Sequence, residues 1–347
     1  MLGQSLPLSG PTARLGLEYQ QGALAWFNEV NRRGGIHGRR IRLVSLDDRY
    51  EPALTLRNTE RLIHHERAFA LFGYVGTPTV KAVLPLLTQQ HIPLVAPLTG
   101  AGLLRQPAQT QVINLRTSYQ VEIDRIVDDL VRSGRQRIAV LHQRDAFGED
   151  GLAASRRALA RHHLSAVATA SIPRNSSDAA AAAQRIVAAS PSAVILITGY
   201  PGAAAFSQEL RQRGSDAQLM SVSFVGTRGL QDALPGGLGN GIGIAQVVPF
   251  PWNARVPVVA DYQRQMRRQA GPMHYGFVSL EGYLAARLIS EALQRMGPNP
   301  TRAGLLKAFA AMGDLDLGGY PIRLGPGDRQ ASDYVELTFL GSQRWEP

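Results

Sequence analysis

The chain has 347 residues, of which 44% are hydrophobic and 18% are charged, and its formal net charge is +10 at pH 7. This composition excludes a largely disordered chain, and the length predicts about two domains. The basic residues stand singly or in pairs such as Arg39-Arg40, which argues against a nucleic-acid partner. The absence of cysteine excludes disulfides and thiolate metal sites, and no apolar run reaches the roughly 18 to 20 residues of a membrane span.

The first part of the chain alternates apolar runs rich in Val, Ile and Leu with longer stretches of helical period, which predicts a parallel sheet covered by helices. The first predicted helix carries Leu17 and Phe27 on one stripe and stops at Gly34. The third is predicted to begin at Thr77-Pro78, with Thr77 as its cap. The predicted strands are Leu2–Leu6, Ile41–Leu46, Ala68–Phe72, Leu94–Ala96 and Val112–Leu115.

The same alternation restarts after Arg116-Thr117-Ser118 and predicts a second α/β unit. Its predicted helices are Glu122–Arg132, Gly148–His162, Asp178–Ala189 and Ala203–Arg213. Its predicted strands are Ile138–His142, Ala166–Ile172, Ala193–Thr198, Leu219–Ser223 and Ile242–Val248. Two more helices, Val256–Gln269 and Ser279–Met296, follow without a strong strand between them, so we expect them to cover the first unit.

Candidate hinges lie where Pro, Gly or Ser mark the ends of elements, near Ser118, near Pro249-Phe250-Pro251 and near Pro326-Gly327. Three crossings would make each lobe discontinuous. The predicted fold is therefore α/β, with two Rossmann-like lobes of parallel strands joined by a three-segment hinge. We place residues 1–117 plus 250–327 in lobe I and residues 118–249 plus 328–347 in lobe II.

Several short motifs follow one another in a fixed order. They are Gln4–Pro11, Asp47-Asp48, Phe72–Thr77, Ile92–Pro97, Asn114–Arg116, Phe147–Gly151 and Thr198–Tyr200. Over essentially the whole chain, their order and spacing resemble the branched-chain amino-acid (leucine/isoleucine/valine-binding) family of periplasmic solute-binding proteins. The resemblance implies the type I periplasmic binding fold, in which two lobes close over a ligand, and the role of solute-binding receptor of an ABC importer.

The resemblance also implies a periplasmic location after removal of a leader peptide, an inner-membrane ABC permease as partner, a monomer and no cofactor. The expected ligand is an amino acid, an aromatic or other small carboxylate, or an amide. A ligand-sensing regulator of the same fold, similar to amide sensors, stays open as an alternative. An enzyme is not expected, because the sequence has no HExxH, P-loop or Gly-x-Ser-x-Gly motif.

Ligands of open parallel sheets sit beyond the carboxyl ends of the strands, and this rule selects candidates in the first unit. The hydroxyl of Thr77 and the N–H groups that open the following helix could hold a ligand carboxylate, unless Thr77 only caps that helix. Gly100 stands where the family usually has a hydroxyl residue, so one contact could be missing or shifted. The ligand-binding candidates of this unit are Ser9, Tyr74, Thr77, Leu98, Thr99 and Gly100.

The second unit offers aromatic side chains that follow strand ends next to glycine, where core packing is less expected. Relatives place an acidic residue, which meets a ligand ammonium, about where this chain has Ser223. Either another acid such as Glu122 takes over, or the ligand carries no ammonium group. The candidates of this unit are Tyr119, Phe147, Tyr200, Ser223 and Phe224.

Overall fold

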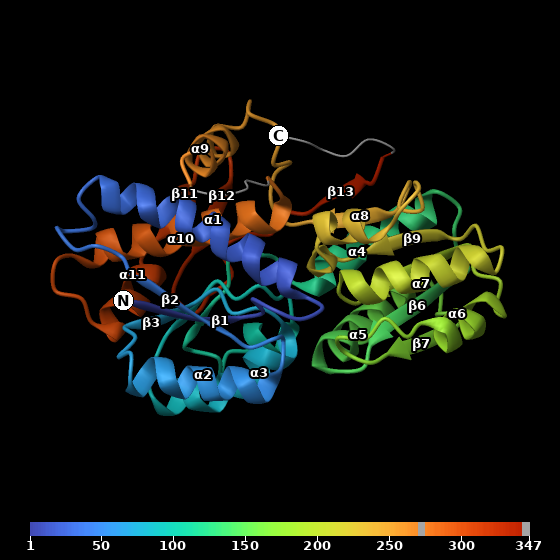
Figure 1. Cartoon of the computed structure of the whole chain (residues 1–347), viewed down its shortest axis with the longest axis horizontal. Helices are drawn as coiled ribbons and strands as arrows, with labels where there is room; N and C mark the ends of the chain where they lie inside the picture. The colour runs from blue at the N-terminus through green and yellow to red at the C-terminus, as the bar shows by residue number, and fades with distance from the viewer. Residues whose placement is uncertain (270–274, 342–347) are drawn as a thin grey trace.

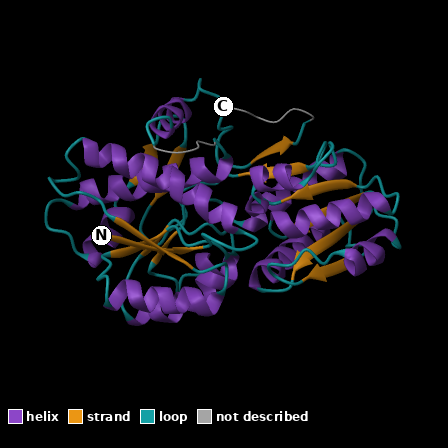
Figure 2. Cartoon of the chain, viewed as in Figure 1, coloured by secondary structure: helices purple, strands orange, loops and turns teal. Residues whose placement is uncertain are grey.

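The computed structural model describes residues 1–269 and 275–341, so residues 270–274 of the predicted lobe I and 342–347 of the predicted lobe II lie outside the described part. Its strands form two mainly parallel sheets and one two-stranded ribbon. Helices cover the faces of both sheets, and the two sheets lie side by side (Figures 1 and 2). We call each sheet with its helices a lobe. The predicted α/β class with two parallel sheets is confirmed.

The first sheet has the strand order β2-β1-β3-β4-β5, and all its paired strands run parallel. Helices α2 and α3 lie on one side of it, and α1 and α10 on the other (Figure 1). The strands are β1 (Leu2–Leu6), β2 (Leu43–Asp47), β3 (Ala70–Phe72), β4 (Leu94–Val95) and β5 (Val112–Ile113). The helices between them are α1 (Ala13–Arg32), α2 (Pro52–His64), α3 (Thr77–Gln89) and the short 3-10 helix η1 (Gly102–Arg105).

The last third of the chain returns to the first lobe. Helices α9 and α10 pack against α1, as predicted. Two glycines allow the closest approach, since a Cβ at Gly22 would lie 1.7 Å from the carbonyl oxygen of Ser279 and one at Gly282 would lie 2.1 Å from that of Tyr19. The elements of this part are α9 (Pro257–Met266), α10 (Phe277–Met296), α11 (Arg302–Ala310) and the ribbon of β11 (Gly313–Asp316) and β12 (Pro321–Leu324).

The second sheet has the order β13-β10-β9-β8-β6-β7, with β13 antiparallel to β10 at its edge. One buried cluster lies between the sheet and α6, α7 and α8, while α4 and α5 pack on the other face. The strands are β6 (Ile138–Gln143), β7 (Thr169–Ile172), β8 (Ala193–Ile197), β9 (Gln218–Ser221), β10 (Gly243–Gln246) and β13 (Glu336–Phe339). The helices are α4 (Tyr119–Arg132), α5 (Ala146–Arg161), α6 (Ala180–Val187), α7 (Tyr200–Gln212), α8 (Thr227–Ala233) and the 3-10 helix η2 (Ser223–Val225).

Several predicted element ends were wrong because side chains and glycines set them locally. Helix α4 begins earlier than predicted, since the Ser118 hydroxyl accepts from the N–H of Val121. The same holds for α5, where Asp145 caps the N-terminus. Thr77 is not the cap of α3, because Gly76 with φ 97° holds that place.

The chain passes between the lobes after β5, after β10 and after β12, close to the predicted hinges. The segments after β5 and after β12 run alongside each other. The N–H of Asn114 donates to the carbonyl of Arg329 at 2.7 Å, and the N–H of Ala331 donates to the carbonyl of Asn114 at 2.8 Å. The segment after β10 is held to the ribbon by the Tyr320 hydroxyl, which donates to the Val247 carbonyl at 3.0 Å. The domain boundaries within these segments stay a prediction.

Candidate ligand-binding site

Two threonine hydroxyls meet where β3 and β4 end. The side chains of Thr77 and Thr99 are fully buried, and their oxygens lie 2.7 Å apart. A β-bridge between Val75 and Leu98 brings the two strand ends together. Because Thr77 opens α3, the hydroxyl pair lies beside first-turn N–H groups that have no partner within the helix, and such groups favour an anion.

Aromatic rings from both lobes meet near Gly100, the residue that follows Thr99. Phe147, at the start of α5, packs against Tyr119 and Phe224 with ring centroids 5.1 and 4.7 Å apart. Tyr50, which follows β2, reaches Phe224 across the lobes at 5.8 Å. All four rings are fully or almost fully buried, so this part of the interface offers mainly apolar area with two phenol hydroxyls.

Gly100 has a structural reason to lack a side chain. Its carbonyl accepts a hydrogen bond of 2.7 Å from the N–H of Tyr119, and a Cβ would lie 2.7 Å from both this nitrogen and the Tyr119 ring. A larger residue would push Tyr119 away from Phe147. The missing hydroxyl at this position is therefore replaced by close packing of an aromatic residue from the next segment.

Ser223 is bonded to a carboxylate from another element. The Glu122 side chain, on the first turn of α4, accepts from the Ser223 N–H at 2.7 Å and from its hydroxyl at 3.1 Å. Glu122 is fully buried, and burial raises its pKa to about 7, while Arg116 and the Ser223 bonds act in the opposite direction. Since Glu122 fixes the Ser223 N–H, the chain leaves the sheet after Ser221, which is why the predicted strand Leu219–Ser223 was too long.

A buried ion pair lies behind the rings. The guanidinium of Arg116 donates through Nε and Nη2 to the two carboxylate oxygens of Glu281 on α10, each at 2.8 Å. Within the described residues, Arg116 Nη1 and the Tyr119 hydroxyl are buried without a well-formed hydrogen bond. Burial raises the pKa of Tyr119 to about 12, while the charge of Arg116 and the neighbouring Thr99 hydroxyl act in the opposite direction.

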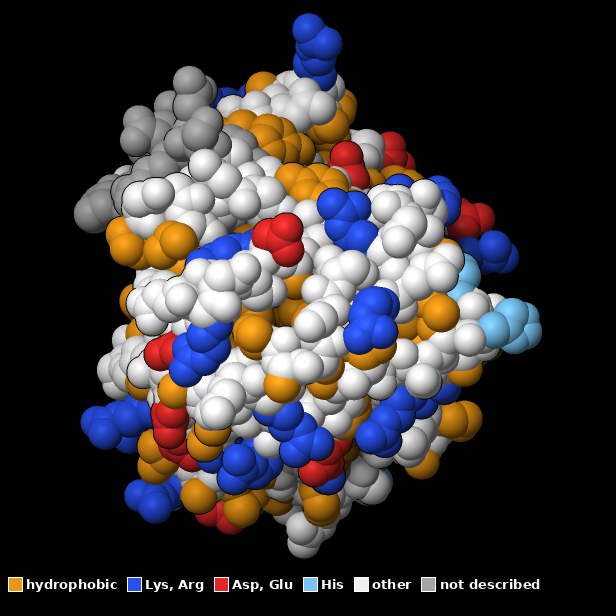
Figure 3. Space-filling view, turned by 90° about the vertical axis from the view of Figure 1, so that its right-hand side faces the viewer, with side chains coloured by type: hydrophobic (Ala, Val, Ile, Leu, Met, Phe, Trp, Pro, Cys, Tyr) orange, Lys and Arg blue, Asp and Glu red, His pale blue; other side chains and the backbone are white. Residues whose placement is uncertain are grey.

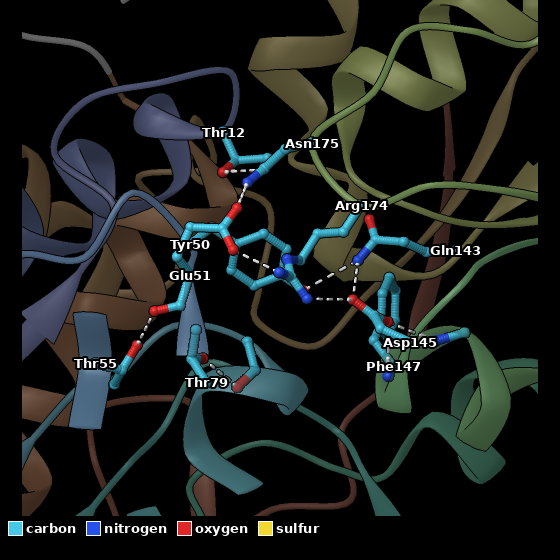
Figure 4. A network of polar contacts seen from close by, with 12 residues as sticks. Thr12, Tyr50, Glu51, Thr55, Thr79, Gln143, Asp145, Phe147, Arg174 and Asn175 are labelled. Carbon is cyan, nitrogen blue, oxygen red and sulfur yellow. Dashed lines mark hydrogen bonds and ion pairs between the residues drawn. The ribbon is translucent and has the colours of Figure 1, made fainter. Parts of the chain in front are cut away.

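A polar network joins the lobes beside the aromatic rings (Figure 4). Arg174, from the loop after β7, donates to the Glu51 carboxylate at 2.5 Å and lies 3.9 Å from Asp145. The next residue, Asn175, donates to Glu51 at 2.8 Å. Gln143 donates to the Tyr50 hydroxyl at 3.3 Å. The described arrangement is thus one in which the lobes touch over the candidate site.

Three predicted site residues do not join this group. Ser9 is exposed and its hydroxyl donates to Asp47 at 2.5 Å. Tyr74 is buried in the core next to α2, where its hydroxyl lies 2.9 Å from that of Thr59. Tyr200 is half-buried and lines an open groove of about 900 Å³ between α1 and α8. The structure brings the others together, with Leu98 buried behind the threonine pair: Thr77, Leu98, Thr99, Gly100, Tyr119, Phe147, Ser223 and Phe224.

Tyr50 also belongs to this group of side chains, although it was not among the candidates from the sequence. It follows Asp47-Asp48 at the carboxyl end of β2, and strand-end position was the signal that could have found it. The Asp48 carboxylate accepts the Tyr50 N–H at 2.9 Å, and the positive φ of 61° at Tyr50 turns the ring toward the second lobe. Burial raises the pKa of Asp48 to about 6.

Other kinds of site find little support in the described residues. They contain no group of three or more His, Asp or Glu side chains placed to hold a metal ion. None of the helices in the described ranges is both long and apolar enough to cross a membrane. On the face shown in Figure 3, Lys and Arg side chains lie scattered, with acidic side chains between some of them.

The chain is similar to several known proteins. A crystal structure of a possible leucine/isoleucine/valine-binding protein from Rhodopirellula baltica is 34% identical, covers 98% of this chain and 94% of that one, and has a TM-score of 0.92. The crystal structure of a substrate-binding periplasmic protein from Ralstonia solanacearum is 35% identical, covers 98% of this chain and 97% of that one, and has a TM-score of 0.93. An amino acid binding protein of Pseudomonas aeruginosa is 25% identical over 64% of this chain but only 59% of its own length, which is less than two thirds.

The family model described as periplasmic binding protein matches residues 2–340, which is nearly the whole chain. This match confirms the resemblance seen in the ordered motifs, and the solved structures confirm the type I periplasmic fold. The chain belongs to the periplasmic binding protein family.

Proposed function

We propose that this protein is the extracytoplasmic solute-binding receptor of an ABC importer, and that it holds a small amino acid or related carboxylate between its two lobes. The observation that carries the proposal is the meeting of strand-end residues from both sheets at one place. Thr77 and Thr99 come from the first lobe, Phe147 and Phe224 come from the second, and all are buried there.

The chemistry of this place suits a small solute with one anionic end and one apolar end. The hydroxyls of Thr77, at the start of α3, and of Thr99, after β4, would receive a carboxylate, and the ring of Phe147 would cover an apolar side chain. The names of similar proteins, which include a possible leucine/isoleucine/valine-binding protein, support the same solute class. Periplasmic location and docking on a permease are parts of the proposal.

A thermal-shift panel of ligand-stripped protein tests the proposal. The panel holds branched-chain and aromatic amino acids, their des-amino carboxylates and small amides. A solute at about 100 times its dissociation constant adds roughly 2.7 kcal/mol of stability. We expect at least one solute to raise the melting temperature, and Thr99→Val to abolish that shift. The exposed Thr88→Val serves as control.

If the panel gives no shift, the receptor proposal loses its basis. If a solute does bind, genetics separates transport from sensing, because an importer receptor is required for growth on its solute and a sensor is not. A strain that lacks the protein but still takes up the bound solute at the normal rate would contradict the importer role and favour the sensing alternative.

A further inference from the structure

One arginine side chain holds two of the segments that pass between the lobes. We call residues 114–118, after β5, the first crossing segment and residues 325–335, after β12, the third. Arg105, at the end of η1, donates through Nη2 to two carbonyl oxygens of the first crossing segment, at 2.7 and 2.9 Å. Its Nε donates at 2.5 Å to the side-chain oxygen of Gln330 in the third. A single guanidinium therefore joins η1 to both segments.

The charge of Arg105 is not neutralised by the groups that it binds. Its Nη1 donates to the Ala101 carbonyl at 2.9 Å, so that all four of its acceptor oxygens are neutral. Burial lowers the pKa of Arg105 to about 10, and the charge of Arg116 acts in the same direction. The guanidinium is still charged at neutral pH, so it gains stability from an acid that is brought near to it.

The second lobe brings such an acid to η1. Asp150, on α5, accepts from the N–H of Gly102, the first residue of η1, with its carboxylate oxygens at 3.2 and 3.3 Å. Burial raises the pKa of Asp150, while the Gly102 bond and the charges of Arg157 and Arg105 act in the opposite direction. Because η1 belongs to the first lobe and α5 to the second, this contact exists only while the lobes touch.

A cavity of about 260 Å³ lies beside Arg105, between η1 and the crossing segments. Its lining includes Leu104 from η1, Asn114 from the first crossing segment and Gly327 from the third. Space of this kind lets neighbouring segments move relative to each other at a lower cost than a close-packed core would. The hydrogen bonds of Arg105 therefore resist a movement that side-chain packing leaves open on this side.

We propose that Arg105 is a clamp for the hinge, and that Asp150 tightens this clamp when the lobes come together. Arg105 holds the first and third crossing segments in the arrangement that belongs to touching lobes. The charge of Asp150 stabilises Arg105 in that arrangement alone. The clamp favours the closed arrangement before a solute binds, so the proposal goes beyond the receptor function and does not depend on the identity of the solute.

Hydrogen exchange of the ligand-free full chain tests the clamp, since an amide exchanges when its hydrogen bond opens. The reporters are the N–H groups of Asn114 and Ala331, which join the two crossing segments. We expect Arg105→Gln to speed the exchange of both by at least about 10-fold, while the amide of Ile195 in the central strand β8 keeps its rate. Arg105→Lys should restore part of the protection, because lysine keeps the charge but not the planar fork.

The matched control is Arg302→Gln. Arg302 also donates to three carbonyl oxygens, those of Ala68, Phe69 and Gln90, and none of them belongs to a crossing segment. This variant should leave the exchange of the two reporters unchanged. The clamp is overturned if Arg302→Gln speeds the reporters as much as Arg105→Gln does, if Arg105→Gln speeds β8 equally, or if it leaves the reporters unchanged. Should Arg105→Gln not fold, Arg105→Lys is compared with wild type by the same reporters.

The part played by Asp150 is tested by a double-mutant cycle. Asp150→Asn keeps an acceptor for the Gly102 N–H but removes the charge. We expect it to speed the exchange of the reporters by about 3-fold when Arg105 is present and to have no effect in Arg105→Gln. Glu149→Gln, which changes the exposed neighbouring acid, should have no effect in either background. Equal effects of Asp150→Asn in both backgrounds would show that Asp150 does not act through Arg105.

Discussion

Arg116 and Glu281 form a bidentate ion pair that joins the first crossing segment to helix α10, with both side chains almost fully buried. The two residues are far apart in the sequence, so the pair fixes the segment that leaves the first lobe onto a helix that returns to it. Coulomb attraction and two charge-assisted hydrogen bonds offset the desolvation of both ions only as long as both are present.

Removal of one charge of the Arg116–Glu281 pair should therefore lower the free energy of unfolding. We expect Glu281→Gln to lower the free energy of unfolding by about 3 to 5 kcal/mol, because it leaves Arg116 charged and buried. The matched control on the same helix is Glu291→Gln, whose pair with Arg295 is partly exposed and should contribute less than about 1 kcal/mol. Urea denaturation measures both, and equal losses in the two variants would contradict the role given to the buried pair.

Glu122 should make the stability of the ligand-free protein fall as the pH rises. Its pKa in the folded state is about 7, above the ordinary 4.5, so the folded state binds the proton more tightly than the unfolded state does. The loss of folding stability caused by ionisation of Glu122 is absent below about pH 4 and grows between the two pKa values. It is complete above pH 7, where it reaches about 3 kcal/mol. Glu122→Gln should accordingly stabilise the protein at pH 8 and change little at pH 4. Denaturation midpoints at both pH values test this, and a gain of the same size at both would refute it.

Gly282→Ala should loosen the contact between α1 and α10. Alanine favours a helix, but its Cβ would lie 2.1 Å from the Tyr19 carbonyl oxygen, so the two helices must separate. Overpacking of this kind costs about 1 to 3 kcal/mol. Gly325→Ala is the control, because no atom lies within 4 Å of its added Cβ. Thermal unfolding compares the two, and an unchanged melting temperature for Gly282→Ala would show that α1 and α10 adapt freely.

Arg174→Ala should shift the lobes toward an open arrangement. Its ion pair with Glu51 bridges the lobes but is partly exposed, so we expect an effect of about 1 kcal/mol or less, which is several-fold in the ratio of closed to open molecules. Small-angle scattering should give a larger radius of gyration for Arg174→Ala than for wild type. Arg144→Ala, an exposed arginine of the same lobe, should scatter like wild type. Identical curves for all three proteins would exclude a role of Arg174 in closure.

Much of the fold was predictable because its central strands are continuous apolar runs. β1 has the predicted bounds, and β8 differs by one residue. The elements that the sequence did not reveal lack this signal. β13 lies at a sheet edge with Phe339 exposed, and the ribbon strand β11 is mostly exposed, so neither carries a run of buried residues.

The site was partly predictable, because strand ends and glycines mark where a parallel sheet presents its loops. The position of Tyr74 away from the other candidates has a local cause. Gly73, with φ 60°, interrupts the alternation of β3, so that Tyr74 joins the same buried cluster as Leu71. The sequence offered Glu122 only as one alternative, since its partner Ser223 is 101 residues away and no local pattern joins the two.

The packing of α10 on α1 also bears on how the chain is made. Synthesis proceeds from the N-terminus, so α1 leaves the ribosome long before residues 277–296, which cover it, have been translated. Until then the first lobe exposes its apolar helix face and cannot complete its core, although its whole sheet is already present. The core of this lobe can therefore close only after residues 277–296 have been synthesised.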